Sequence, residues 1–339
     1  MRRGEDRWGG AAAGPAKLRQ RRRPRGIVPV PRACYPDSVA QLLYHRLPTE
    51  QPNRRSAALD RLALSAILRL MSREDARAIR AVERQHAAIA RAIRLIADSL
   101  RRGGRLFFVG AGTSGRLGVL EAAECPPTFS TPPALVQAIM AGGHGAVFRS
   151  REGTEDEELA GRRAVRQRVR AGDVVVGISA SGVTPFVEGA LRAVARGART
   201  ILITGNPRSA IPAEVRITLS VGPEILAGST RMKMGTATKL VLNMLTLGAM
   251  VRLGKTYGNL MVDVRPTSRK LRARAVGLVE RIAGCSPRAA RRALQEARGR
   301  VKAAVLIARG GLTAAQARRR LAQTGGSLRN ALQDRQSSH

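Results

Sequence analysis

Two short stretches of the sequence combine glycine with side-chain hydroxyls, and each comes directly after a run of apolar residues. The first, GAGTSG, spans residues 110–115, and the second, SASGVTP, spans residues 179–185. Where a strand ends in such a loop and a helix follows, unpaired backbone N–H groups and hydroxyls meet at one point, which suits a phosphate. The glycines allow the backbone to approach the anion closely.

Neither loop matches a familiar nucleotide-binding pattern. The first lacks the Lys-Ser/Thr ending of the nucleoside triphosphate loop, and its glycines are not spaced as G-x-G-x-x-G. A hydroxyl-rich loop without lysine indicates a phosphate that is already carried on a small molecule. Taken alone, the first loop is equally consistent with an ordinary strand-to-helix turn, but two such loops converge where open α/β sheets bind ligands. The predicted phosphate- and sugar-binding residues are Thr113, Ser114, Ser179, Ser181 and Thr184.

Apolar runs predict the strands that position these loops. They cover residues 106–109, 135–140, 173–178, 199–204 and 215–221, and helical patterns lie between most of them. Continuously apolar strands alternating with helices indicate a parallel sheet that is covered on both faces. We therefore expect an α/β fold, a flavodoxin-like three-layer sandwich with helices flanking the sheet.

Helical periodicity predicts the remaining elements. One helix is expected from Ser56 to Met71, a second from about Arg73 to Arg101 with Ser72 as its N-cap, and a long apolar helix from about residue 229 to 253. Beyond residue 266 there is no strand signal, and glycines separate the expected helices. These helices cover residues 269–282, 287–295, 301–308, 313–321 and 327–332.

This pattern divides the chain into three parts. Residues 1–46 form a basic extension that lacks apolar periodicity and is expected to be disordered, with a functional basic arm as the alternative. Residues 47–265 are expected to form one α/β domain, with its N-terminal helices, that carries both phosphate-binding loops. Residues 266–339 form a small all-α C-terminal domain.

The formal net charge of +36 comes almost entirely from arginine, because 54 of the 60 basic residues are arginines spread along the chain. A nucleic-acid-binding domain usually concentrates its charge on one face and interleaves aromatic residues, which make up only 3% here. We favour an arginine-biased background over a dedicated polyanion patch. Either interpretation predicts only non-specific binding to nucleic acid at low salt.

Cysteine and histidine are too few and too scattered to predict a disulfide framework or a zinc site. The three cysteines, Cys34, Cys125 and Cys285, lie far apart in the sequence. No metal and no cofactor is therefore expected. Because no apolar run approaches the roughly 20 residues of a membrane span and the N-terminal residues show no apolar segment or cleavage site typical of a secretory signal, we expect a cytoplasmic protein without a membrane partner.

Five motifs together resemble one family. They are GAGTSGRLGVLEAAECPPTF, REGTEDEE, SGVTP, GPEILAGSTRMKMGTATKLVLNM and YGNLMVDVRPT, and their order and spacing are similar to those of the bacterial N-acetylmuramic acid 6-phosphate etherases. That family has the sugar isomerase (SIS) fold, and the resemblance extends over residues 47–332. It implies cleavage of the D-lactyl ether at C3 of the sugar phosphate, giving N-acetylglucosamine 6-phosphate and lactate.

The resemblance also implies roles for individual residues. Glu124 matches the glutamate that donates a proton to the leaving group, and Glu155 matches the second catalytic glutamate, which we assign as the base. Without the resemblance, Glu121 and Glu124 would be interpreted as a solvated helix pair, and the acidic run around Glu155 as a surface turn. Ser229, Thr230 and Lys233 are expected to help close the site, with a helix cap as the alternative for Ser229.

Two positions depart from the family pattern. Val183 stands where the etherases usually have arginine, and Met234 where they usually have alanine. Loss of the arginine is expected to weaken a contact to an anionic group such as the lactyl carboxylate. Ser179, where the family often has alanine, adds a hydroxyl that is expected to compensate in part.

The resemblance further implies a homodimer whose active sites contain residues of both subunits, and a C-terminal domain similar to ubiquitin-associated helical domains. Two other classes of function compete with the enzyme. A non-catalytic sugar-phosphate sensor, like the related glucokinase regulatory proteins, would share the first loop but would need neither Glu124 nor Glu155. A sugar-phosphate-responsive DNA-binding regulator would need a helix-turn-helix domain, for which residues 1–46 show no pattern.

Overall fold

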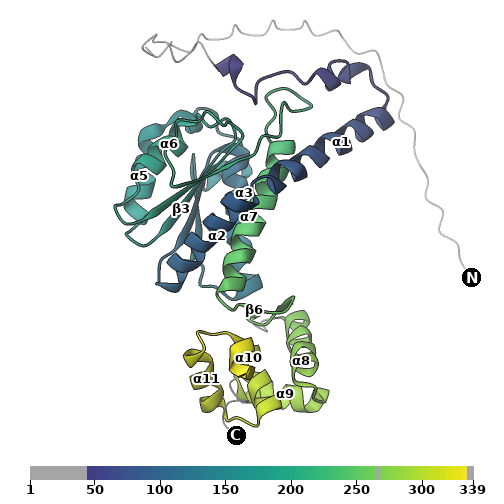
Figure 1. The fold of residues 1–339 in the computed structure, drawn as a ribbon, viewed down its shortest axis with the longest axis vertical. Coiled ribbons are helices and arrows are strands. Elements are labelled where there is room, and N and C mark those ends of the chain that lie inside the picture. Colours follow the sequence, from purple (N-terminus) through teal and green to yellow (C-terminus); the bar gives the residue numbers. More distant parts are fainter. Residues whose placement is uncertain (1–43, 265–267, 334–339) are drawn as a thin grey trace, which may run out of the picture. The chain divides into compact units, whose positions relative to one another are not determined.

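The computed structural model describes residues 44–264 and 268–333 (Figure 1). The basic extension expected at residues 1–46 lies outside the described residues except for its last part, residues 44–46, which form a short helical turn. Whether this extension is a disordered tail or a functional arm stays a prediction.

The central sheet has five parallel strands. They are β1 (Leu106–Gly110), β2 (Val136–Met140), β3 (Val174–Ser179), β4 (Arg199–Thr204) and β5 (Val215–Thr218), and their spatial order is β2-β1-β3-β4-β5. This is the flavodoxin-like order, in which the chain changes direction between β1 and β3. Gly110 pairs with Ile178 across that boundary, so the loops that follow β1 and β3 emerge side by side. All five predicted strands are confirmed.

Helices cover both faces of the sheet, as the predicted three layers require (Figure 1). One face carries α1 (Leu64–Glu83), α2 (His86–Arg101), α3 (Gly112–Phe129) and α7 (Lys233–Arg252). The other carries α5 (Glu158–Arg168) and α6 (Pro185–Arg192), and the short α4 (Gly145–Phe148) follows β2. Alternate strand residues point to opposite cores, so Phe108 packs with the first group of helices and Phe107 with the second.

The helices upstream of the sheet differ from the prediction. Helix α1 continues through Ser72 and ends at Glu83, and α2 begins at His86, so the expected break at Ser72 is wrong. The Ser72 hydroxyl donates to the carbonyl of Leu68, 3.1 Å away, which satisfies it inside the helix. A serine followed by an acidic residue therefore resembled an N-cap without being one.

Helix α7, which was predicted at about residues 229–253, begins at Lys233 and ends at Arg252. Among the described residues it is the one helix that is long and apolar enough, by length and composition alone, to cross a membrane. It contacts α1, α2 and α3, and residues such as Val241, Leu242 and Leu245 are fully buried in the shared core. An apolar helix enclosed by other helices is the pattern of a core helix of a globular domain.

The C-terminal region is helical, as predicted. A short hairpin, β6 (Thr256–Tyr257) and β7 (Leu260–Met261), precedes it and was not predicted. The helices are α8 (Arg269–Ala283), α9 (Pro287–Glu296), α10 (Val301–Gly310), α11 (Ala314–Gln323) and α12 (Leu328–Gln333). They enclose a second core that includes Val279, Val305 and Leu328. The exact domain limits at residues 46 and 265 stay predictions.

Candidate active site

A pocket of about 490 Å³ opens at the carboxyl ends of β1 and β3. Both hydroxyl-rich loops form part of its wall, together with the acidic segment after β2 and the loop that precedes α7. Six of the nine residues predicted for the site line this pocket; they are Thr113, Ser114, Glu155, Ser181, Thr184 and Ser229. The sheet's change of direction between β1 and β3 therefore does bring the two loops to one ligand-sized cavity.

The first loop is a tight junction between β1 and α3. Gly112 has φ +52°, which favours glycine, and α3 begins at this residue. A Cβ on Gly110 would lie 2.8 Å from the backbone nitrogen of Gly115, so the strand end and the helix start touch backbone to backbone. Because the first N–H groups of α3 have no helical acceptors, they are available to an anion beside Thr113 and Ser114.

The second loop is held together by Ser179, which does not line the pocket. Its hydroxyl lies 2.7 Å from the Thr184 hydroxyl and accepts the backbone N–H of Gly182 at 3.0 Å. Ser179 is buried, and its oxygen is occupied within the loop. Ser179 is therefore not placed to contact a substrate or to offset the change at Val183, contrary to expectation. It orients Thr184 instead, and Ser181 and Thr184 face the cavity.

Gly182 provides a test of this loop. It has φ +71°, and a Cβ there would lie 2.7 Å from the Thr204 hydroxyl oxygen and 2.8 Å from Cβ of Ser209. We expect Gly182→Ala to lower the free energy of unfolding by about 1–3 kcal/mol and to weaken sugar-phosphate binding, because the loop must shift. Thermal unfolding and calorimetric titration with N-acetylglucosamine 6-phosphate measure both. Gly277→Ala, in α8 with open space around the position, is the control: alanine favours the helix, so this variant should not lower the free energy of unfolding and should leave binding unchanged.

Glu155 lines the pocket from the segment that follows β2 and α4. It belongs to a single helical turn, Thr154–Asp156, that follows Gly153 with φ +82°. The side chain is half-buried and lines the cavity. Within the described residues its carboxylate has no hydrogen-bond or ion-pair partner, and this leaves it open to a ligand in the pocket.

Glu124 lies elsewhere in the single chain. It is exposed on α3 and does not line the pocket. It comes eleven positions after Thr113 on the same helix, which corresponds to about 16 Å along the helix axis. The neighbouring Glu121 is buried, with its carboxylate bound to Lys239 at 2.8 Å and to the Thr246 hydroxyl at 2.5 Å, so the alternative of a solvated Glu121/Glu124 pair is wrong for Glu121.

The loop before α7 contributes Gly228, Ser229, Thr230 and Arg231 to the pocket. Because α7 begins only at Lys233, Ser229 does not cap it, and Ser229 instead faces the cavity. The expectation for Lys233 needs correction. Its ammonium group is buried against Glu74 at 2.5 Å and the carbonyl of Pro223 at 2.7 Å, so it does not line the pocket.

The sequence reasoning missed three arginines of the pocket wall: Arg116, Arg151 and Arg231. Arg116 donates to the carbonyls of Ala146 and Val147 in α4, and Arg151 donates to the carbonyl of Gly142. Their positive charge favours an anionic ligand. In a chain with 54 arginines the residue type gave no signal, although Arg231 belongs to the quoted GSTRMK motif and Arg116 directly follows the first loop.

Comparison with known families agrees with this geometry. The family model described as "SIS domain" matches residues 152–248, and the one described as "Glucokinase regulatory protein N-terminal SIS domain" matches residues 88–195. The parallel sheet and its two hydroxyl-rich loops thus define an SIS-domain protein. Among the described residues no group of three His, Cys, Asp or Glu side chains could hold a metal ion.

Relatives narrow the class further. The chain is 52% identical over 265 residues to an N-acetylmuramic acid 6-phosphate etherase of Symbiobacterium thermophilum, covering 77% of this chain and 88% of that relative. It is 57% identical over 267 residues to one of Gloeobacter violaceus, covering 77% and 87%, and 49% identical over 288 residues to one of Synechocystis, covering 84% and 94%. The chain belongs to the N-acetylmuramic acid 6-phosphate etherase family.

Proposed function

We propose that this protein cleaves the D-lactyl ether of N-acetylmuramic acid 6-phosphate, acting as a carbon–oxygen lyase. The observation that carries this proposal is the Glu155 carboxylate, which has no hydrogen-bond or ion-pair partner among the described residues and lies in a pocket whose wall also contains both hydroxyl-rich loops. A site that only binds a sugar phosphate needs the loops but not the carboxylate. About half of the residues are identical to those of the etherases named above over most of the chain.

The pocket suits a substrate with two anionic groups. The phosphate would bind where the start of α3 meets Ser181 and Thr184, because N–H groups and hydroxyls converge there. The lactyl carboxylate would need a cation of its own. Val183 cannot supply one, but Arg231 lines the pocket and has no ion-pair partner among the described residues.

The reaction requires a base and an acid. In the ring-opened sugar, the C1 aldehyde acidifies the proton on C2. Glu155 would remove that proton, the electrons would form a C2=C3 double bond, and the C3–O bond would break as the lactyl oxygen receives a proton. Water then adds its hydroxyl to C3 and a proton to C2, which gives N-acetylglucosamine 6-phosphate and lactate.

The position of Glu124 supports a homodimer with composite sites. In one chain Glu124 is exposed and separated from the pocket by most of the length of α3. If Glu124 is the acid, a second copy must present it at the pocket of the first, in the way that two-fold symmetric interfaces pair different residues of two subunits. A phosphorylated substrate does not readily cross membranes, which supports a cytoplasmic location.

Incubation of the purified protein with N-acetylmuramic acid 6-phosphate tests the proposal. We expect equimolar release of lactate and N-acetylglucosamine 6-phosphate, measured by an enzymatic lactate assay and mass spectrometry. Calorimetric binding of N-acetylglucosamine 6-phosphate is measured in parallel. Binding without lactate release would refute the enzyme and favour the sugar-phosphate sensor, a function consistent with the match to the glucokinase regulatory protein domain.

A further inference from the structure

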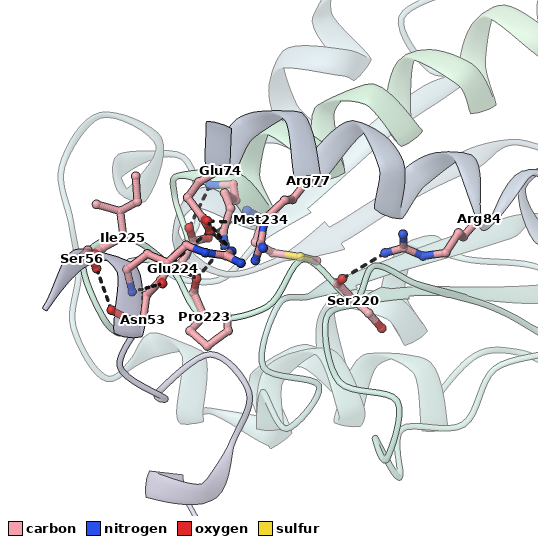
Figure 2. A network of polar contacts seen from close by, with 12 residues as sticks. Asn53, Ser56, Glu74, Arg77, Arg84, Ser220, Pro223, Glu224, Ile225 and Met234 are labelled. Atoms are coloured by element: carbon pink, nitrogen blue, oxygen red, sulfur yellow. Dashed lines mark hydrogen bonds and ion pairs between the residues drawn. The ribbon is translucent and has the colours of Figure 1, made fainter. Parts of the chain in front are cut away.

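A buried polar network lies beside the start of α7 (Figure 2). Its centre is the ion pair between Lys233 and Glu74, whose side chains are both 1% exposed. Glu74 also accepts hydrogen bonds from Asn53 at 3.0 Å and from Arg55 at 3.2 Å. Burial alone would raise the pKa of Glu74, but the hydrogen bond and charge of Lys233, with the bonds from Asn53 and Arg55, hold it below its ordinary value.

The network closes the base of one loop, residues 225–232. On the side where the loop begins, the carbonyl of Pro223 accepts the Lys233 ammonium at 2.7 Å. The buried carboxylate of Glu224 accepts the backbone N–H groups of Lys233 at 3.0 Å and Met234 at 2.9 Å. These bonds satisfy the start of α7 and also hold the two ends of the 225–232 loop together.

The middle of the same loop, its tip, reaches the substrate pocket. Residues 228–231 line the cavity beside both hydroxyl-rich loops. Among the described residues, the hydrogen bonds that hold this tip are backbone bonds within the loop and one bond to the N-terminal segment, from the N–H of Gly228 to the carbonyl of Thr49 at 3.1 Å. The conformation of the tip therefore depends strongly on the closure at its base.

We propose that the buried Lys233–Glu74 ion pair positions the 225–232 loop over the pocket, so that Lys233 and Glu74 are positioning residues for the etherase reaction. The inference rests on the proposed function. Lys233 acts through Ser229, Thr230 and Arg231, which line the cavity, and does not itself line it. The segment from Ser229 to Lys233 therefore contains three residues that line the pocket and one, Lys233, that holds them in place.

A charge placed this deep is costly unless it is paired, and an aliphatic side chain in its place would be expected if stability alone mattered. Lysine at this position makes two bonds that apolar residues cannot make, to Glu74 from α1 and to the carbonyl at the loop's base. Lys233 thus attaches the end of the loop both to α1 and to Pro223, shortly before the loop begins.

Lys233→Met tests the proposal, because methionine preserves the volume but removes both bonds. We expect hydrogen exchange at residues 225–232 to become about tenfold faster, while the middle of α7 keeps its protection. We expect KM for N-acetylmuramic acid 6-phosphate to rise about tenfold with kcat changed less, since binding groups lose their position. Calorimetric affinity for N-acetylglucosamine 6-phosphate should fall in parallel.

Lys302→Met is the matched control. Lys302 is also a buried lysine that bridges a carboxylate and a carbonyl, those of Asp263 at 2.9 Å and Gly326 at 2.8 Å, but it lies in the C-terminal helical region and does not line the pocket. We expect it to lower thermal stability and to leave exchange at residues 225–232 and KM unchanged. If Lys233→Met does not fold, Glu74→Gln, which keeps the side-chain shape, addresses the same loop.

The outcomes separate this inference from the proposed function. If the wild-type protein releases no lactate, exchange and sugar-phosphate affinity still report on the loop. Faster exchange with weaker binding in Lys233→Met supports the positioning role. Loss of stability without either change, as in Lys302→Met, would overturn it and leave the ion pair as part of the core.

Discussion

Glu155→Gln is expected to reduce lactate release by about 10³-fold, the middle of the range for loss of a general base. Glutamine keeps the size and polarity of the side chain but cannot accept the C2 proton. Because Glu155 makes no hydrogen bond or ion pair among the described residues, the fold should be unaffected and thermal unfolding should be unchanged. Steady-state kinetics with N-acetylmuramic acid 6-phosphate measure the effect, which should fall on kcat and only weakly on KM.

Asp156→Asn is the control for this prediction. Asp156 belongs to the same helical turn, but it is exposed and does not line the pocket. Its loss removes the same charge from the same segment, and activity should remain within about twofold of wild type because exposed charges interact weakly. Equal losses in both variants would mean that the negative charge of the turn matters and that Glu155 is not the base.

Glu124→Gln is expected to abolish ether cleavage while leaving proton removal intact. The variant should exchange the C2 hydrogen of N-acetylmuramic acid 6-phosphate with solvent deuterium, because Glu155 remains, but it should release no lactate, because the leaving oxygen lacks its acid. NMR spectroscopy in D₂O follows both events in one sample. Failure of exchange in this variant would mean that the acid and base assignments are wrong.

Mixing two inactive variants tests whether the site is shared between subunits. Glu124→Gln and Glu155→Gln protomers, co-expressed with different tags, would form mixed dimers in which one site has both intact glutamates. With random pairing, half of the dimers are mixed and each has one complete site, so about a quarter of the wild-type activity should return. No recovery in isolated mixed dimers would place both glutamates of a working site on one chain.

The sequence predicted those features that depend on neighbouring residues in the chain. The strands and both hydroxyl-rich loops follow from local apolar runs and glycines, and the C-terminal helices follow from periodicity and glycine stops. The convergence of the two loops was predicted from the α/β pattern, and the pairing of β1 with β3 at the change of direction produces it. Ser72 was misinterpreted because a serine that bonds back to residue i−4 has the same sequence appearance as an N-cap.

The site was less predictable because its members are defined by three-dimensional partners. Lys233 and Glu74 are 159 residues apart, and nothing in either segment shows that they meet. Ser179 belongs to the same motif as Ser181, yet it ends the strand and is buried, whereas Ser181 faces the pocket. One chain alone also cannot reveal what the exposed Glu124 would meet.

The most direct test of the central claim follows the wild-type reaction in water enriched in both ¹⁸O and deuterium. Elimination of lactate followed by addition of water predicts N-acetylglucosamine 6-phosphate with ¹⁸O on C3 and deuterium on C2, and lactate whose hydroxyl oxygen comes from the substrate. Mass spectrometry of both products distinguishes the outcomes. Intact substrate, or ¹⁸O in the lactate hydroxyl with none on C3, would contradict this account.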